Sequence, residues 1–167
     1  PVPIMILDNL PEGVRGIWSL WRIEVTAGQW QKHRFMPLFV SDHEQVFQPT
    51  AYRIWDILIT NETTAKRYFT DSDASAIFRE AREQAERYGR GIFEELIEDY
   101  RNHLRAEQEK IENAFASRRR AIEKIGLPEV RNQRLTQLKQ EKQQWEQNIT
   151  SDKEIVPDLT PIMMLWV

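Results

Sequence analysis

The sequence predicts an α+β protein, in which a small antiparallel sheet drawn from both chain ends is joined to a long antiparallel helical hairpin. Apolar and polar residues alternate over residues 21–25, as they do in a half-buried strand. Apolar residues recur in steps of three and four over 93–125, which is the spacing of a coiled-coil-like helix. The apolar run 162–167 has the length of a strand, and we expect it to join the N-terminal strands.

Length and composition fit one domain. The chain has 167 residues, of which 41% are hydrophobic and 29% charged, as in a soluble globular protein. It has no cysteine, which excludes disulfides, thiolate metal sites and cysteine nucleophiles. No apolar run approaches the roughly eighteen residues of a membrane helix, so we expect a cytoplasmic protein with no membrane contact. The first residues have no basic region, so they do not predict a secretory signal. Because they also lack an initiator Met, we expect the chain to be a piece of a longer protein, with a processed N-terminus as the alternative.

The first third of the chain predicts strands. A short apolar run over 4–7 is followed by a strand over 16–25, and residues 27–29 predict a hairpin turn into a strand over 30–40. Pro37 has no N–H to donate to a neighbouring strand, so it indicates an edge or a bulge. Further signals predict a turn at 42–44 and a short strand at 45–47.

A change of period then predicts a helix, with Thr50 as its N-cap and apolar residues at helical spacing up to Ile59. Residues 62–71 predict a linker, and the chain is helical and highly charged from residue 72. The predicted regions are a sheet region, 1–70 plus 155–167, and a helical region, 71–154.

The helical region predicts an antiparallel hairpin with its turn near 126–129. This turn holds a glycine suited to the end of one helix and a proline suited to the start of the next. Gln108 and Arg118 are polar interruptions of the first helix's apolar seam. The second helix, over 129–149, has its seam at Leu135, Leu138, Lys142, Trp145 and Ile149. The expected neighbours across the hairpin are Phe115 with Lys142, Ile122 with Leu135 and Ile111 with Trp145.

The tail of the chain predicts two kinds of structure. Residues 154–161 contain two prolines and predict a loop. The following run, 162–167, is apolar at every position, which predicts a strand that is buried on both faces.

Charge is segregated along the chain, although the net charge is only −3. Residues 71–100 have four basic and nine acidic side chains, whereas residues 101–142 have eleven basic and six acidic ones. The basic excess gathers around the hairpin turn, in the basic tip (residues 115–139). Its cations can neutralise nucleic-acid phosphates or meet an acidic protein surface, and the plain alternative is a solvated helix end. The candidate contact residues are Arg118, Arg119, Arg120, Lys124, Arg131, Arg134 and Lys139.

No segment predicts an active site. The phosphate-binding patterns GxxxxGK[ST] and GxGxxG, the metal motif HExxH and the nucleophile motif GxSxG are all missing from the sequence. Residues 89–91, Gly-Arg-Gly, predict a kink or a close approach of the helix, and 42–44 predict a turn rather than a cation site. Acidic pairs such as Glu94 with Glu98 predict a solvated helix face. We therefore expect no catalytic residue, metal or cofactor in this chain.

Short strings spread over nearly the whole chain carry a family resemblance. They are GVRGIWSLWR at 13–22, HRF at 33–35, LFV at 38–40, PTA at 49–51, IWD at 54–56 and IGLPEVRN at 125–132. These strings resemble the C-terminal region of bacterial SWI2/SNF2-type helicase-like ATPases. The motor of that family uses a Walker A loop, a DExH-type box and arginine fingers, and none of them stands in this sequence, so no catalytic residue carries over.

The resemblance implies a non-catalytic accessory domain of a SNF2-type DNA-dependent ATPase, whose motor would lie upstream with its ATP and Mg. The implied partners are that motor and double-stranded DNA or RNA polymerase, with the basic tip as the contact. Two alternatives stay open. One is a protein-interaction or self-association module, specified by the polar seam residues Gln108, Arg118 and Lys142. The other is a structural brace that packs on the motor lobes.

Overall fold

The computed structural model describes residues 2–7, 10–60, 67–150 and 154–167, without the side chains of residues 71, 149 and 150. Contacts divide the chain into unit 1, Pro1–Leu96 with Val156–Val167, and unit 2, Ile97–Ile155. Unit 1 contains a five-stranded, mostly antiparallel sheet, and unit 2 contains a helical hairpin. The predicted α+β class is therefore confirmed.

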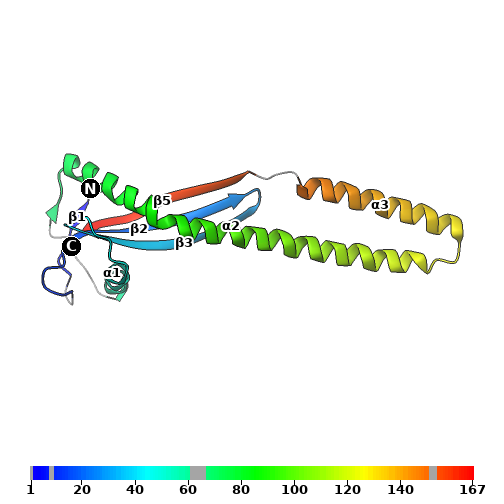
Figure 1. Ribbon diagram of the computed structural model, residues 1–167, viewed down its shortest axis with the longest axis horizontal. Helices are drawn as coiled ribbons and strands as arrows, with labels where there is room; N and C mark the ends of the chain where they lie inside the picture. The colour runs from blue at the N-terminus through cyan, green and yellow to red at the C-terminus, as the bar shows by residue number, and fades with distance from the viewer. Residues whose placement is uncertain (1, 8–9, 61–66, 151–153) are drawn as a thin grey trace. The chain divides into compact units, whose positions relative to one another are not determined.

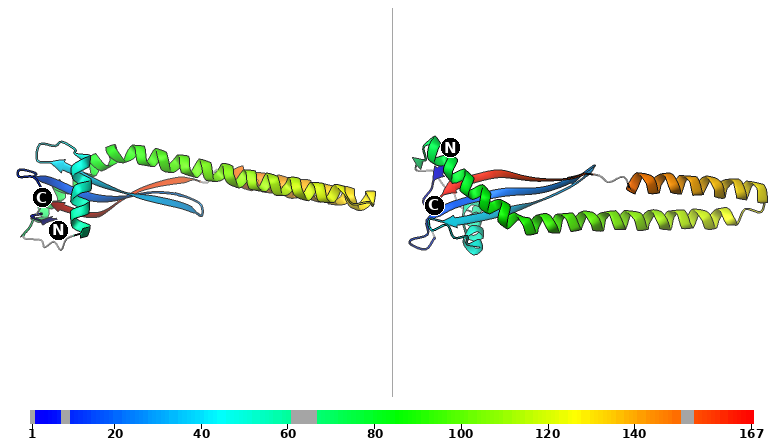
Figure 2. Two further views of the ribbon diagram at one scale, coloured as in Figure 1. Left: turned by 90° about the horizontal axis from the view of Figure 1, so that it is seen from below. Right: turned by 45° about the horizontal axis from the view of Figure 1, so that its top comes forward.

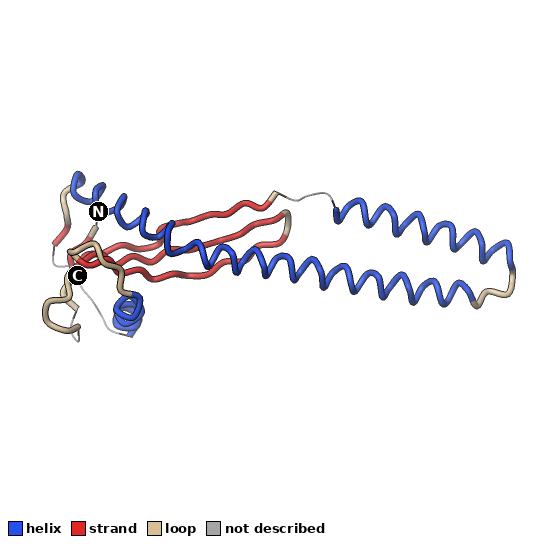
Figure 3. Tube along the Cα trace, viewed as in Figure 1, coloured by secondary structure: helices blue, strands red, loops and turns tan. Residues whose placement is uncertain are grey.

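The sheet consists of β1 (Pro3–Ile4), β2 (Gly16–Ala27), β3 (Trp30–Ser41), β4 (Arg67–Tyr68) and β5 (Ile155–Trp166). Their order is β3-β2-β5-β1-β4, so strands from both chain ends lie side by side (Figures 1 and 3). β2 and β3 form a long hairpin beside β5, as the right-hand view of Figure 2 shows. Its turn includes Gly28, whose φ of 62° is a conformation that glycine adopts at low cost. β1 pairs with β5 in parallel, which is the exception to the antiparallel pattern.

Helices cover both faces of the β2–β3 hairpin. The Trp18 indole N–H donates to the carbonyl of Ala51 in α1 (Gln48–Thr60) at 2.9 Å. The Trp21 ring lies 6.1 Å from the ring of Phe78 in α2 (Asp71–Glu123). Trp18 and Trp21 are three positions apart in β2, so their side chains point to opposite faces of the sheet. The helices that they contact, α1 and the first part of α2, therefore pack on opposite faces. The apolar face positions of β2 are thereby buried.

Pro37 lies in an edge strand, which is one of the two predicted settings, because β3 ends the sheet order. On the side away from β2, the Phe47 N–H donates to the Phe39 carbonyl at 3.0 Å and the Ser41 N–H donates to the Gln45 carbonyl at 2.8 Å. Pro37 shares the parity of residues 39 and 41, so its nitrogen faces the same free edge. The missing N–H therefore removes no bond between β3 and β2.

Two expectations about the C-terminal segment are wrong. The predicted loop over 154–161 is largely strand, because β5 begins at Ile155. The φ of proline suits an extended backbone and each proline removes only one donor, so two prolines do not end the strand. The run 162–167 is also not buried on both faces, since Ile162 and Met163 are 49% and 50% exposed. Leu165 is buried, and it belongs to the same core cluster as Trp18 and the buried residues of α1.

Several boundaries near the first two helices also differ from prediction. α1 begins at Gln48, and the Ala51 N–H donates to the Phe47 carbonyl, so Thr50 lies inside the helix rather than at its N-cap. The predicted strand 45–47 reduces to one bridge, between Val40 and Val46. The predicted linker 62–71 lies partly outside the described residues, and its described part contains the short strand β4.

The first part of α2 packs closely on the sheet through small residues. Ala81, Ala85 and Gly89 are buried at intervals of four residues, along one face of the helix. A Cβ atom on Gly89 would lie 3.0 Å from the Ile23 Cδ1 atom, which confirms the predicted close approach. For this reason the division between units falls after Leu96, whereas the predicted boundary after residue 70 marks only the beginning of α2.

Candidate functional site

The basic tip is built around the turn between α2 and α3 (Pro128–Thr150), close to the predicted 126–129. The last turn of α2 tightens, as the Ile125 N–H donates to the Ile122 carbonyl at 3.0 Å. Pro128 opens α3, where the first N–H groups have no partner within a helix and a proline costs nothing. The Arg131 N–H then donates to the Leu127 carbonyl at 3.0 Å.

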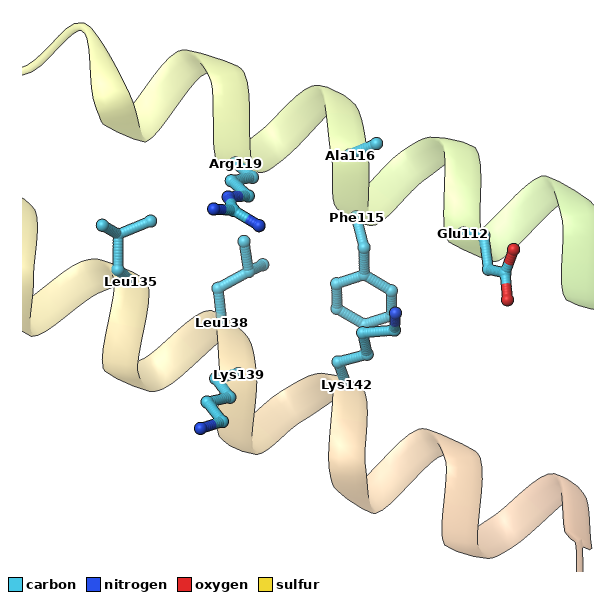
Figure 4. A pocket seen from close by; sticks show the side chains of 8 residues that line it. All are labelled: Glu112, Phe115, Ala116, Arg119, Leu135, Leu138, Lys139 and Lys142. Atoms are coloured by element: carbon cyan, nitrogen blue, oxygen red, sulfur yellow. The ribbon is translucent and has the colours of Figure 1, made fainter.

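The two helices of unit 2 pack through an apolar seam. The ring centroids of Phe115 and Trp145 lie 6.5 Å apart, and Leu138 is buried between the helices. Phe115 and Lys142 come from opposite helices and line one groove, so this predicted neighbour pair is confirmed (Figure 4). Ile111, Ile122 and Leu135 are half-buried as the predicted seam requires, while the side chain of Ile149 lies outside the described residues.

The polar positions of the seam differ from prediction. Gln108 is exposed and Glu107 takes the half-buried position, because steps of three and four place 104, 107 and 111 on one helix face. Arg118 lies at the flank of the seam rather than inside it. Its Nη1 atom is 2.7 Å from the Glu141 Oε2 atom on α3, and its guanidinium lies 5.9 Å from the Phe115 ring centroid. This ion pair joins the two helices at one register.

The structure brings all seven predicted contact residues to the end of the hairpin, within unit 2. Arg131 is half-buried and its guanidinium donates to the Ile125 carbonyl at 3.4 Å, whereas the other six side chains are exposed. The Arg119 Nε atom lies 2.9 Å from the Glu123 Oε1 atom, an exposed pair on the same helix. Exposed pairs of this kind contribute little stability, so Arg119 can exchange its partner at low cost.

Four cations of the basic tip have no such partner. Among the described residues, no ion pair or hydrogen bond engages the side chains of Arg120, Lys124, Arg134 and Lys139. Arg120 lies in the last turn of α2, where a positive charge also complements the helix dipole. Four unpaired cations within about three turns of the hairpin end form a concentrated positive surface that an anionic partner can use.

A groove of about 510 Å³ runs along one side of the basic tip, which we call the tip groove. Figure 4 shows Leu138 and Lys142 reaching from α3 toward α2, beside Phe115 and Arg119. The seam signal located only part of it, since Glu112 and Ala116 lie next to the seam rather than on it. Glu112 precedes Phe115 by three residues and Ala116 precedes Arg119 by three, and this helical spacing is the signal that could have placed them. The groove is lined by Glu112, Phe115, Ala116, Arg119, Leu135, Leu138, Lys139 and Lys142.

The segment 42–44 forms the predicted turn. The His43 and Gln45 N–H groups both donate to the Ser41 hydroxyl oxygen, at 3.3 and 3.2 Å, and Glu44 has a φ of 60°. Two acidic residues in the middle of α2 lie next to cations: Glu95 lies 3.2 Å from Arg34 and Glu98 lies 3.4 Å from Arg101. In the part of the chain that the structure describes, no three His, Asp or Glu side chains are grouped so that they could hold a metal ion.

A second hollow, in unit 1, is acidic. It has a volume of about 400 Å³ and lies between the turn at Glu44 and the first turns of α2. Burial raises the pKa of Glu80 above its usual value, and the nearby carboxylates of Glu44 and Glu83 raise it further. Arg79 also lines this hollow, so it is not uniformly negative.

Across the described residues, no helix combines the length and the apolarity that crossing a membrane requires. Comparison with protein-family models, with curated proteins and with solved structures finds no significant match for this chain. The basic tip and its groove therefore carry the functional argument through their own chemistry.

Proposed function

We propose that this chain is a non-catalytic accessory domain that holds double-stranded DNA through its basic tip, for a SNF2-type ATPase motor encoded upstream. The observation that carries the proposal is the set of four exposed cations without an ion pair at the hairpin end: Arg120, Lys124, Arg134 and Lys139. The family resemblance of the dispersed sequence strings supports the assignment to such a motor, which would bind ATP and Mg.

Phosphate contacts fit these side chains for two physical reasons. Arginine and lysine bind phosphate oxygens by charge-assisted hydrogen bonds, and cations that are not already paired lose no partner when they do so. The two-helix scaffold also holds the cations in place before binding, since Phe115, Leu138 and Trp145 pack the helices together in one seam. Contacts of this kind position a duplex without reading its sequence.

Salt dependence tests the proposal. We expect the whole chain to bind a fluorescein-labelled 20-base-pair duplex, with an affinity that falls roughly 40- to 150-fold between 50 and 200 mM NaCl, as three or four phosphate contacts require. The triple variant Arg120→Gln, Lys124→Gln and Arg134→Gln should lose at least tenfold in affinity at 50 mM and show a flatter salt slope.

A matched control separates local contacts from net charge. The variant Arg101→Gln, Arg105→Gln and Lys110→Gln removes three exposed cations from the same helix, each of which contacts a polar neighbour at i±3. We expect it to lose less than threefold in affinity. Equal losses in both triple variants, or an affinity that does not change with salt, would contradict the proposed DNA contact.

A further inference from the structure

The tip groove combines an apolar floor with a positive rim. Phe115 and Ala116 from α2 and Leu135 and Leu138 from α3 supply the apolar lining. Ala116 is exposed, and its single methyl group leaves space that a larger side chain would fill. The floor of the groove therefore remains accessible on this side of the hairpin, although Leu138 in the seam is buried.

The rim carries a net positive charge. Arg119, Lys139 and Lys142 border the groove, against one carboxylate, that of Glu112. Lys142 pairs with Glu146 at 3.5 Å and Arg119 with Glu123, both as exposed i,i+4 pairs on their own helix. Lys139 has no ion pair among the described residues. A ligand with carboxylates can thus engage all three cations without breaking a contact between the helices.

The shape and the floor favour a helix over a nucleic acid. Two antiparallel helices leave a groove between them into which a third helix packs by the same ridge and groove geometry. The aliphatic side chains of such a helix would bury the leucines and the phenyl ring, in the manner of helix-in-groove recognition. A DNA backbone offers phosphates to the rim but little apolar surface to the floor.

We infer that the tip groove is a docking site for an acidic amphipathic helix of a partner protein, with apolar side chains on the floor and carboxylates on the rim. This goes beyond the proposed DNA contact and uses a surface that shares only Lys139 with the four unpaired cations: Arg120, Lys124 and Arg134 do not line the groove. The two activities can therefore fail separately.

A designed peptide pair tests the docking site. The probe is a fluorescein-labelled 18-residue helical peptide with leucines at i, i+3, i+4 and i+7 and glutamates on both flanks, and its twin carries lysines in place of the glutamates. We expect the whole chain to bind the acidic peptide at least tenfold more tightly than the lysine twin, by fluorescence anisotropy in 100 mM NaCl.

Two substitutions with identical chemistry locate the binding. Ala116→Glu places a carboxylate and extra volume in the groove, whereas Ala114→Glu makes the same change at an exposed position of α2 outside it. We expect the first variant to weaken peptide binding at least tenfold and the second to change it less than twofold. Lys139→Gln, which removes a rim cation without filling the groove, should weaken it about threefold. Circular dichroism checks that each variant keeps its helix content.

Each remaining outcome overturns the inference. These outcomes are no binding of the acidic peptide, equal binding of its lysine twin, or equal losses from the two alanine variants. A fourth outcome combines two results: the DNA duplex displaces the peptide completely, and Ala116→Glu also abolishes binding of the duplex. Together these results would make the groove a nucleic-acid site. If only the peptide experiment fails, duplex binding by the unsubstituted chain still stands, and the two proposals are distinguished.

Discussion

At the residue scale, a few side chains fix how the elements of unit 1 meet. Trp18 is 1% exposed and its indole N–H donates to the Ala51 carbonyl, so one side chain both fills the core and orients α1 on the sheet. Trp21, on the opposite face of β2, donates to the Ser19 hydroxyl at 2.8 Å. Both tryptophans satisfy their polar atom inside the core, which explains how they can be buried without a desolvation cost.

Glu80 gives a residue-scale prediction about pH. Its pKa is raised by burial first and then by the Glu44 and Glu83 carboxylates, so the folded protein binds this proton more tightly than the unfolded chain does. The free energy of unfolding therefore falls as pH rises through the pKa of Glu80. Glu80→Gln removes the penalty, and we expect it to raise the urea midpoint at pH 7 but much less at pH 4.

A second variant checks the cause of that pH dependence. Glu44→Gln removes one of the two neighbouring carboxylates and should recover part of the gain at pH 7. Urea unfolding followed by circular dichroism measures both variants at both pH values. A gain from Glu80→Gln that is the same at pH 4 and pH 7 would show that the charge of Glu80 is not the cause.

At the element scale, α2 changes its environment along its length. Its first part presents small and apolar residues to the sheet, whereas its last turns present a half-buried seam to α3. Two glycines near the middle of α2 differ in the space around them. Gly89 is buried with the Ile23 side chain 3.0 Å from where a Cβ would stand, and Gly91 has no atom within 4 Å of such a position.

These glycines predict opposite results for substitution. Gly91→Ala should raise the free energy of unfolding by about 0.5–1 kcal/mol, because alanine has the higher helix propensity and meets no neighbour. Gly89→Leu should lower it by about 1–3 kcal/mol, because the side chain would force α2 away from β2 and β3. Chemical denaturation of both variants gives the comparison, and a stabilised Gly89→Leu protein would refute the close packing.

At the scale of the whole molecule, the two compact units differ in how much they bury. In unit 1, helices cover both faces of a sheet, and most of the fully buried side chains are found there. In unit 2, two helices share one seam, in which Leu138 is buried and its neighbours are half-buried. Stability should therefore vary along the single helix α2, since local opening depends on how many buried contacts it breaks.

Hydrogen exchange tests this difference. We expect the amides of α2 over residues 77–96 to exchange at least tenfold more slowly than those over 105–120, because the first group packs against the sheet of unit 1, whereas the second shares a single half-buried seam with α3. Mass spectrometry of peptide fragments gives both rates in one experiment, and α3 should exchange like the second group. Uniform protection along α2 would mean that the helix opens as one unit.

The sequence alone predicted the features that depend on local pattern. Alternation predicted β2, Pro37 indicated either an edge or a bulge in β3, and the pair of glycine and proline near residue 126 placed the hairpin turn. The seven cations of the basic tip are also a local feature, because residues close to one turn must lie close in space. These elements follow from the period of the backbone, which is the same in every fold.

Only the tertiary structure decided which neighbours complete each element. Two prolines made residues 155–161 resemble a loop, yet pairing with β2 holds them in β5; β4 has two residues, too few for any periodic signal. The tip groove likewise needs side chains from two helices. Ala116 alone does not indicate a groove, because the other wall is formed by residues of α3 such as Leu135 and Lys139. The physical reason is that periodicity reports how one segment faces its surroundings, while pairing and grooves depend on segments that are distant in the sequence.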